Sequence, residues 1–311
     1  MAGTPPSPGL SVVVAGASGF LGTHLVAALR ERGHGVTALV RREPDGPGQS
    51  RWDPDAGTLD RDLVGAADVV VNLAGSPTAG NPHSKKWARE LERSRVTTTS
   101  LLAEVVAGAA RGGATRTFLA GNGISYYGDH GDAVLTEASD TRGHSTLTKV
   151  ARAWEAAASP AADAGARVCV LRTSPVMDHR SPPLKQLRLL FKAGLGGRIG
   201  NGRQYMPMSS LRDWVAAAVH LAEHPDASGP FNICLPHAPI NAEFTRELAA
   251  QLGRKALLPA PGPLVKVGAG RMGPELLGSV NVRPEALLAT GFTFADPDVA
   301  ATLRTALNPP D

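Results

Sequence analysis

Three glycines stand at three-residue intervals near the start of the chain, at positions 16, 19 and 22. In a loop between a strand and a helix, Gly16 permits a tight turn, Gly19 lets the backbone approach a pyrophosphate, and Gly22 allows close packing. The free N–H groups at the start of the following helix suit a phosphate. The spacing predicts a dinucleotide site contacted by Gly16, Ser18, Gly19, Phe20 and Leu21.

Two consecutive arginines, Arg41 and Arg42, follow the apolar run 36–40. An acid at this point of a dinucleotide fold binds the 2′-hydroxyl of the adenosine ribose, whereas an arginine accommodates a 2′-phosphate. The first acid, Glu43, comes later, and a guanidinium holds a phosphate through two parallel hydrogen bonds. This pattern favours NADP(H) over NAD(H). The alternative is that one or both arginines are ordinary surface residues.

Two further segments are expected to contact the cofactor. Leu73, Ala74 and Gly75 end the apolar run 67–73, and small residues there let the backbone pass close to the adenine side of a dinucleotide. The alternative for this segment is a plain transition from a strand to a loop. Ser174 and Pro175 come shortly after the run 167–172 and complete the predicted cofactor contacts.

Alternating strands and helices are needed to position these residues. Short apolar runs rich in β-branched residues predict buried strands, and apolar positions at helical spacing predict the helices between them. Strands are expected at 11–15, 36–40, 67–73, 117–120 and 167–172, with helices at 23–32, 87–109 and 146–164. The alternation predicts an α/β fold, a doubly wound parallel Rossmann sheet with a smaller C-terminal substrate lobe.

The pattern also suggests how the chain is divided. Residues 1–10 are rich in Pro and Gly and are expected to form a disordered leader. Residues 11–175 are expected to form the NADP-binding Rossmann domain, to which 213–235 return. The segment 176–212 has little periodicity, and it is assigned with 236–311 to a substrate-binding lobe over the carboxyl edge of the sheet.

Composition argues against several classes of protein. The net charge is +4, but the basic residues are scattered rather than interleaved with aromatics, so no nucleic-acid surface is indicated. No apolar stretch is long enough to span a membrane. Cys169 and Cys234 lie in apolar runs, which favours free thiols in a reducing, cytoplasmic compartment. His220 and His224 close a predicted helix with no third ligand, so no metal site is expected.

Motifs along nearly the whole chain resemble the extended short-chain dehydrogenase/reductase superfamily, and most closely its atypical branch that is similar to sugar-nucleotide epimerases. The resemblance implies a Rossmann fold, a nicotinamide cofactor and a small organic substrate under the C-terminal lobe. The motifs are Gly16–Gly22, Asn72–Gly75, Ser94-Arg95-Val96, Tyr126-Tyr127-Gly128-Asp129, Trp154-Glu155, Arg172-Thr173, Gly202-Arg203-Gln204, Asp213 and Asn241–Phe244.

The chain departs from the superfamily at the positions that usually carry its chemistry. The resemblance implies a Ser or Thr that orients the substrate oxygen, and a Tyr and a Lys that exchange the proton. Aligned on the neighbouring motifs, these three positions hold Asn122, Leu147 and Ala151. Leucine and alanine cannot transfer a proton. Ser210 also stands where the branch commonly has a histidine.

Substitutes for the missing groups lie nearby, so the candidate catalytic residues are Asn122, Tyr126 and Tyr127. The Asn122 amide is able to polarise a carbonyl, or it is a turn residue between two glycines. Tyr126 or Tyr127, and by preference Tyr127, is able to replace the missing acid. The alternative is that either tyrosine packs on the nicotinamide.

The substrate is expected to lie beside Met177, Arg203 and Tyr205. Met177 follows the strand that runs along the nicotinamide in the superfamily, and the other two belong to the Gly-Arg-Gln turn and its continuation. Arg203 is interpreted as an anchor for an anionic or carbonyl-bearing substrate. Its alternative is an ion pair within a loop.

Together these features predict an NADP(H)-dependent oxidoreductase of the atypical short-chain type that acts on a small organic metabolite. Because the usual triad is absent, two other functions stay open. One is a non-redox cyclase, dehydratase or isomerase on the same scaffold, and the other is an NADP(H)-binding regulatory protein. The expected partners are a small-molecule substrate and, in a homodimer, a second copy of the chain.

Overall fold

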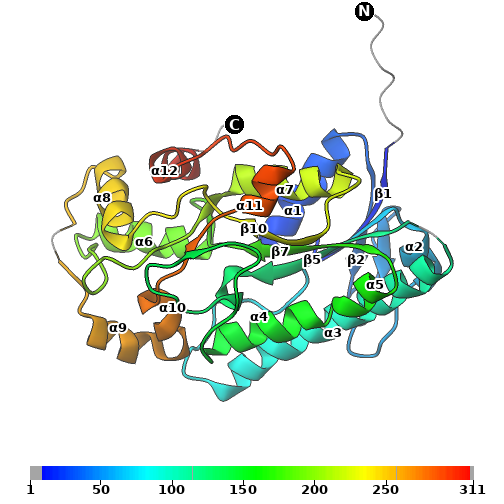
Figure 1. Cartoon of the computed structure of the whole chain (residues 1–311), viewed down its shortest axis with the longest axis horizontal. Coiled ribbons are helices and arrows are strands. Elements are labelled where there is room, and N and C mark those ends of the chain that lie inside the picture. Colours follow the sequence, from blue (N-terminus) through cyan, green and yellow to red (C-terminus); the bar gives the residue numbers. More distant parts are fainter. Residues whose placement is uncertain (1–8, 114, 257, 309–311) are drawn as a thin grey trace, which may run out of the picture.

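A parallel sheet of seven strands forms the centre of the molecule (Figure 1). A computed structural model describes residues 9–113, 115–256 and 258–308. The strand order is β3-β2-β1-β4-β5-β7-β10, which confirms the predicted doubly wound α/β fold. The strands are β1 (Ser11–Ala15), β2 (Gly35–Val40), β3 (Gln49–Arg51), β4 (Val69–Asn72), β5 (Thr117–Gly123), β7 (Arg167–Thr173) and β10 (Gly229–Ile233).

Helices cover both faces of this sheet (Figure 1). One face packs against α1 (Phe20–Glu31), α7 (Leu211–Glu223) and α11 (Glu285–Ala289). The other face packs against α2 (Arg61–Ala66), α3 (Lys85–Arg111) and α5 (Ser159–Asp163), with α4 (Thr146–Ala156) along α3. Strands buried on both sides are hydrophobic without alternation, as Val12, Val13 and Val14 of β1 illustrate.

The segment 146–164 forms two helices rather than the single predicted one. Between α4 and α5 the chain turns at Ala157 and Ala158, and Pro160 stands in the first turn of α5. A proline has no N–H group and is favoured at the start of a helix. The first helix, α4, therefore ends before Pro160, and α5 begins with this proline in its first turn. The break leaves α4 short and directed at the end of β5.

The rest of the chain forms smaller elements beside the carboxyl edge of the sheet. Two short pairs of strands, β6 with β11 and β8 with β9, tie this region together. The elements are η1 (Ile124–Tyr126), β6 (Val134–Leu135), β8 (Val176–Met177), α6 (Pro182–Lys192), β9 (Ser209–Ser210), α8 (Asn241–Gln251), α9 (Gly262–Ala269), η2 (Gly270–Met272), α10 (Gly273–Leu277), β11 (Asn281–Val282) and α12 (Val299–Leu307).

The chain does not follow the predicted division everywhere. Leu287, Phe292 and Phe294 pack with α1 and α7 on the main sheet, although the sequence assigned them to the substrate lobe. These apolar side chains are buried by packing against the main sheet. The C-terminal segment therefore crosses back over the sheet. The predicted leader falls mostly on residues 1–8, which lie outside the described residues.

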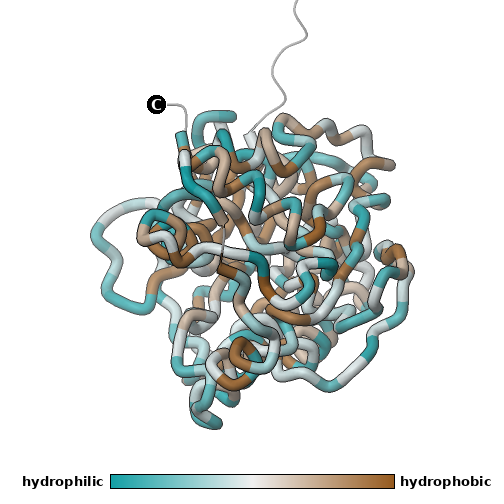
Figure 2. The backbone as a smooth tube through the Cα atoms, turned by 90° about the vertical axis from the view of Figure 1, so that its left-hand side faces the viewer, coloured by the Kyte–Doolittle hydropathy of each residue, from teal (hydrophilic) through white to brown (hydrophobic). Residues whose placement is uncertain are grey.

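Hydropathy follows this arrangement. Figure 2 shows hydrophobic stretches of the tube concentrated in the middle of the molecule and strongly hydrophilic stretches at its periphery. Cys169 and Cys234 are buried and free. Among the described residues, no helix is both long enough and apolar enough to cross a membrane.

Candidate functional site

The glycine loop forms a tight cradle at the carboxyl end of β1. Gly16 has a φ of 81°, in the left-handed region that favours glycine, and a Cβ there would lie 2.6 Å from the carbonyl carbon of Leu73. A Cβ on Gly22 would lie 2.1 Å from the carbonyl oxygen of Gly16. The loop therefore admits only glycine at both positions, and this close approach of backbone fits the predicted pyrophosphate site.

The start of α1 is open for an anion. Its N-cap residue, Gly19, has no side chain to accept a hydrogen bond from the first turn, and that turn holds no acid. The free N–H groups and the positive end of the helix dipole are therefore available. Ser18 is exposed and Phe20 half-buried at this end. Gly16, Ser18 and Gly19 belong to the loop, whereas Phe20 and Leu21 form the start of α1.

The predicted adenine segment lies against the same loop. Leu73 and Ala74 border Gly16, and Ala74 N donates to Asn72 Oδ1 at 3.0 Å. Asn72 Nδ2 in turn donates to Thr99 Oγ1 of α3 at 2.8 Å. These bonds fix the turn that carries Leu73, Ala74 and Gly75 from β4 toward α3.

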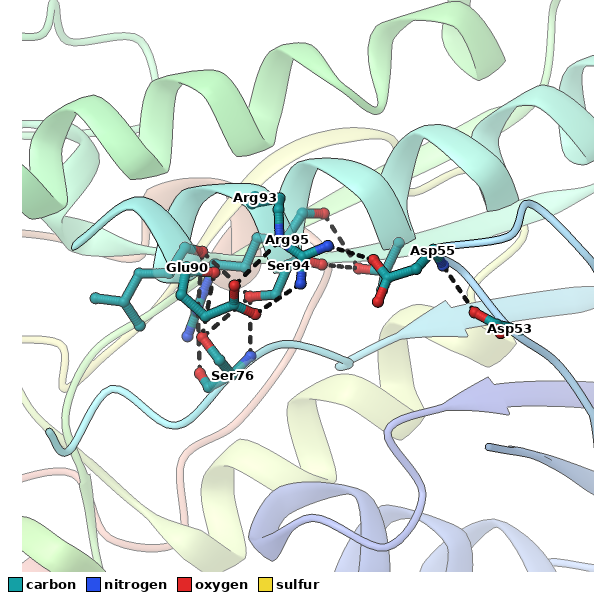
Figure 3. A network of polar contacts seen from close by, with 9 residues as sticks. Asp53, Asp55, Ser76, Glu90, Arg93, Ser94 and Arg95 are labelled. Carbon is teal, nitrogen blue, oxygen red and sulfur yellow. Dashed lines mark hydrogen bonds and ion pairs between the residues drawn. The ribbon is translucent and has the colours of Figure 1, made fainter. Parts of the chain in front are cut away.

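A half-buried arginine, Arg95, lies behind Gly75. Arg95 donates to the carbonyl oxygen of Ser76 at 3.1 Å and to Thr78 Oγ1 at 3.2 Å, while Ser94 Oγ accepts from Ser76 N. Figure 3 shows Ser94 and Arg95 on α3 with Ser76 in the loop after β4. Burial lowers the pKa of Arg95 to about 10. The motif therefore holds the loop after β4 in place.

Neighbouring polar groups of α3 point to another part of the chain. Arg93 pairs with Glu90 one turn earlier and with Asp55, whose own N–H donates to Asp53 (Figure 3). These side chains are exposed to solvent, so the pairs contribute little to stability. They join α3 to the loop after β3.

Arg41 and Arg42 are both exposed directly beyond β2, the strand beside β1. Arg42 pairs with Asp45 and donates to the carbonyl oxygen of Glu43 at 3.0 Å. Arg41 has no hydrogen bond or ion pair within the described ranges. Both guanidinium groups are accessible at the sheet edge that carries the glycine cradle.

Asn122 is turned into the protein rather than toward a ligand. Its side chain is 3% exposed, and Nδ2 donates to Glu155 Oε2 at 2.8 Å and to the carbonyl oxygen of Ala151 at 3.2 Å. Oδ1 accepts from the N–H of Gly123 at 2.7 Å. The amide joins β5 to α4, which corrects the expectation that it holds a substrate oxygen.

Tyr127 is also part of the interior. It is 0% exposed, its hydroxyl donates to Asn232 Oδ1 at 2.8 Å, and Arg172 Nη1 donates to it at 2.8 Å. Burial raises the pKa of Tyr127 to about 12, despite the opposing effect of Arg172. A hydroxyl enclosed in this way cannot reach a substrate, which corrects the preferred assignment of the proton donor.

Tyr126 occupies a different position. It is half-buried beyond the end of β5, and its ring centroid lies 3.8 Å from the guanidinium carbon of Arg172. Arg172 is fixed by an ion pair with Glu155 at 2.7 Å. The Tyr126 hydroxyl has no hydrogen-bond partner among the described residues, so of the two tyrosines only Tyr126 keeps a hydroxyl free for a ligand.

The predicted substrate residues fall into two groups. Met177 is buried in an apolar cluster with Leu184 and Met208, so its side chain does not line a cleft, contrary to expectation. Arg203 is exposed and lines a cleft of about 460 Å³ together with Asp129, Gln204 and other polar residues. Tyr205 is half-buried beside that cleft, and its N–H donates to Ser279 Oγ at 3.1 Å.

Ser174 and Pro175, the first two residues after β7, lie in different environments. Ser174 is buried, and its hydroxyl donates to the carbonyl oxygen of Ile233 at 2.7 Å, so the side chain serves the packing of β10. The hydroxyl is therefore engaged within the protein, and the contact of Ser174 with the cofactor stays a prediction. Pro175 is exposed at the same sheet edge.

Two further charged side chains lie near these residues. Arg180, paired with Asp178 at 2.8 Å, has its guanidinium carbon 6.0 Å from the ring centroid of Phe20, at the start of α1. Glu275 of α10 hydrogen-bonds to two serine hydroxyls near the end of β5. Arg180 belongs to the segment that continues from β7 past Met177, whereas no local motif marks Glu275, because it comes to this region from a distant part of the chain.

The remaining sequence features are structural. Ser210 caps α7 by accepting from the N–H of Asp213, and Asp213 accepts from the N–H groups of Ala295 and Asp296. His220 Nε2 and Thr290 Oγ1 form a hydrogen bond of 2.8 Å. Within the described ranges, no group of three or more metal-binding side chains occurs.

The parallel sheet and the glycine cradle at its carboxyl edge define a Rossmann dinucleotide-binding protein. The model of the NAD dependent epimerase/dehydratase family matches residues 12–234, and a model of a domain of unknown function matches residues 260–306. The chain belongs to the NAD dependent epimerase/dehydratase family. The expected membership of the extended, epimerase-like branch is thereby confirmed.

Individual relatives agree with this assignment. An epimerase family protein of Mycobacterium leprae is 36% identical over 96% of each chain. The human epimerase family protein SDR39U1 is 34% identical over 95% of this chain and 99% of its own.

Solved structures show the same likeness. The structure of human SDR39U1 with NADPH has a TM-score of 0.84 at 31% identity, covering 96% of this chain and 100% of the other. A nucleoside-diphosphate sugar epimerase from Corynebacterium glutamicum has a TM-score of 0.75 at 34% identity, covering 96% of this chain and 58% of the other.

Proposed function

We propose that this protein is an NADP(H)-dependent oxidoreductase of the atypical short-chain type that reduces a carbonyl group of a small organic metabolite. The observation that carries the proposal is the glycine cradle together with the two exposed arginines beyond β2. The NADPH bound by the similar human protein supports the same cofactor. Two free, buried cysteines support a cytoplasmic location.

Each part of the cleft has a role in this proposal. The start of α1 and Gly19 hold the pyrophosphate, Arg41 and Arg42 hold the 2′-phosphate, and the turn at Leu73 borders the adenine. Bound NADPH supplies a hydride. Tyr126 and Pro175 flank the nicotinamide end, and Arg203 attracts a polar substrate into the cleft beside Asp129.

Nucleotide preference tests the cofactor assignment. In an Arg41→Ala/Arg42→Ala variant, the Kd for NADPH should rise about 10- to 100-fold, because charged hydrogen bonds to the 2′-phosphate are lost. The Kd for NADH should stay unchanged. Titration of tryptophan fluorescence measures both constants. An Arg254→Ala/Lys255→Ala variant removes two exposed basic groups elsewhere and serves as the matched control. Equal weakening of both nucleotides would contradict the assignment.

Hydride transfer tests the reaction. NADPH absorbance should fall when the protein is mixed with phenanthrenequinone, nitrobenzaldehyde or cyclohexenone, and the reduced product should form in equal amount. The enclosed hydroxyl of Tyr127 and the engaged amide of Asn122 favour one competitor, a non-redox isomerase or dehydratase. If the protein binds NADPH but oxidises it with none of these carbonyl compounds, the oxidoreductase proposal fails. That result would favour the non-redox isomerase or dehydratase.

A further inference from the structure

A carboxyl group from the C-terminal segment reaches the end of β5. Glu275 lies on α10, and Ser125 Oγ donates to its Oε2 at 2.9 Å while Ser145 Oγ donates to its Oε1 at 2.8 Å. Ser125 belongs to η1, directly after β5, and Ser145 is the N-cap residue of α4. One carboxyl group therefore bridges two elements that are 20 residues apart in the chain.

The location is the corner of the fold where the superfamily keeps its proton-transfer residues. Ser125 stands two residues beyond Gly123, the last residue of β5, and Ser145 stands two residues before Leu147 on α4. Leu147 and Ala151 occupy the positions of the missing Tyr and Lys. Glu275 thus supplies a titratable group to the region from which the usual ones are absent.

The surroundings of Glu275 suit a group that holds a proton. Burial raises its pKa above the ordinary value, although the hydrogen bonds from Ser145 and Ser125 oppose the shift. No Lys, Arg or His forms an ion pair with it in the described part of the chain. Arg271 of η2 donates instead to the carbonyl oxygen of His83. Asp129 lies beside Gly278 at the end of α10, and its carboxylate accepts from the N–H groups of Gly131 and Ser279.

The two serines have different tasks. Ser145 Oγ also accepts from the N–H of Thr148 at 3.1 Å and contacts Thr148 Oγ1 at 2.8 Å, so it is fixed as a helix cap. Ser125 Oγ has Glu275 as its single hydrogen-bond partner among the described residues. Ser125 is half-buried, and with no second partner its hydroxyl hydrogen is able to turn toward a ligand when the protonated carboxyl of Glu275 donates to Ser125 Oγ.

We propose that Ser125 and Glu275 form the acid pair that protonates the substrate oxygen, with Ser145 anchoring the carboxyl group. This inference rests on the proposed reductase function. In the protonated state of Glu275, the carboxyl O–H donates to Ser125 Oγ, and the Ser125 hydroxyl hydrogen turns from the carboxyl to the substrate oxygen. When hydride adds to the carbonyl carbon, Ser125 gives this hydrogen to the developing oxyanion and takes the carboxyl proton of Glu275. The substrate oxygen gains one proton, Glu275 becomes a carboxylate, and water reprotonates it before the next turnover.

Glu275→Gln is the central variant, because glutamine keeps the shape and accepts or donates hydrogen bonds but cannot exchange a proton in this way. With phenanthrenequinone and NADPH, kcat should fall at least about 100-fold, the usual contribution of general acid catalysis. The Kd for NADPH should stay unchanged. Glu275→Asp should restore part of the rate, and Glu285→Gln, at an exposed position of the same segment, is the matched control.

The pH dependence separates proton delivery from a structural role. The wild-type kcat should decline as the pH rises through the pKa of Glu275, because the carboxyl must be protonated, and Glu275→Gln should lose this decline. Burial raises the pKa of Glu137 as well. Nuclear magnetic resonance of isotope-labelled glutamate carboxyls should therefore show, besides Glu137, a group that titrates above the ordinary glutamate value of about 4.3 and is absent from Glu275→Gln. Ser125→Ala should lower kcat as strongly as Glu275→Gln.

The outcomes distinguish the two proposals. If wild type reduces the quinone and Glu275→Gln is equally fast at every pH, the inference is overturned and the oxidoreductase proposal stands. The inference is also overturned if Glu275→Gln has a lower kcat at every pH but keeps the decline of kcat with rising pH. If wild type binds NADPH but reduces none of the carbonyl probes, the oxidoreductase proposal fails, and proton delivery by Glu275 fails with it.

Discussion

The polar side chains behind the carboxyl edge of the sheet form one hydrogen-bonded chain. Asn122 bonds to Glu155, Glu155 pairs with Arg172, and Arg172 donates to Tyr127, which donates to Asn232. Removal of one member of a buried network leaves its neighbours unsatisfied, at a cost greater than the bond itself contributes. These residues therefore hold β5, α4, β7 and β10 together at the edge where a ligand binds.

Tyr127→Phe should destabilise the protein by about 1–3 kcal/mol, because Arg172 and Asn232 each lose a buried partner. Its Kd for NADPH and its rate with phenanthrenequinone should stay close to those of wild type. Chemical denaturation measures the free energy of unfolding. Tyr126→Phe is the matched control, and its stability should be unchanged. A Tyr127→Phe variant with normal stability and a large loss of rate would restore the tyrosine as proton donor.

The sequence predicted the positions of these side chains but not their directions. The motif around Tyr127 and the end of β5 were correctly brought to the sheet edge. Whether a side chain there faces the cleft or the interior depends on partners such as Asn232 and Glu155, which no local pattern names. Glu275 was missed for a related reason, because its serine partners lie 130 and 150 residues away in the chain.

Among the junctions between elements, that of β1 and α1 is tightly constrained. Gly16 passes against Leu73, while Gly22 places the first turn of α1 against the backbone of the loop itself. The helix must enter at this distance for its N-terminus to face the sheet edge. The cofactor site therefore depends on the absence of a side chain at Gly16 and Gly22 as much as on the side chains that are present.

Gly22→Ala should test this constraint. The added Cβ would lie 2.1 Å from the carbonyl oxygen of Gly16 and 2.9 Å from Ala17 Cα, so the loop must shift. We expect a loss of stability of about 1–3 kcal/mol and a Kd for NADPH raised about tenfold or more. Denaturation and fluorescence titration measure the two effects. Gly108→Ala, with no atom within 4 Å of the new Cβ, should instead stabilise α3 by about 0.5–1 kcal/mol. Unchanged binding in Gly22→Ala would contradict the cradle.

Periodicity predicted the elements that pack with long apolar faces. The strands β1, β2, β4, β5 and β7 and the helices α1 and α3 were expected from such patterns. β3 was missed because Gln49, Ser50 and Arg51 are polar and the strand lies at the edge of the sheet. The division of α4 from α5 was missed because helical spacing continues across the proline.

At the scale of the whole molecule, the C-terminal segment serves two sites on opposite sides of the sheet edge. Residues 273–277 carry Glu275 to the end of β5, whereas Phe292 and Phe294 pack over α7. Asp213 fixes the second contact by accepting from the N–H groups that follow Phe294. The same segment therefore carries both Glu275 and the phenylalanines that pack over α7.

Ion pairs also link the ends of α1 and α7, although these two helices lie far apart in the chain. Glu223, at the end of α7, accepts from Arg32 Nε at 2.6 Å and lies 2.9 Å from His34 Nε2. The N–H of Leu10 donates to His34 Nδ1, which leaves the proton of a neutral ring on Nε2, facing Glu223. The cluster joins the segment before β1, the end of α1 and the end of α7.

This cluster should make the fold sensitive to acid. Burial opposes the shift, but Arg32 and His34 hold the pKa of Glu223 below its ordinary value. The unfolded chain therefore binds this proton more readily, so the contribution is present above about pH 4.3 and is lost as the pH falls through the folded pKa. In Glu223→Gln the free energy of unfolding at neutral pH should fall by up to about 1 kcal/mol, because the pair is partly exposed. The difference from wild type should vanish near pH 3, as denaturation curves at a series of pH values would show. Glu31→Gln, an exposed change on α1, should follow the wild-type curve. A difference that persists unchanged at low pH would assign the loss to packing rather than charge.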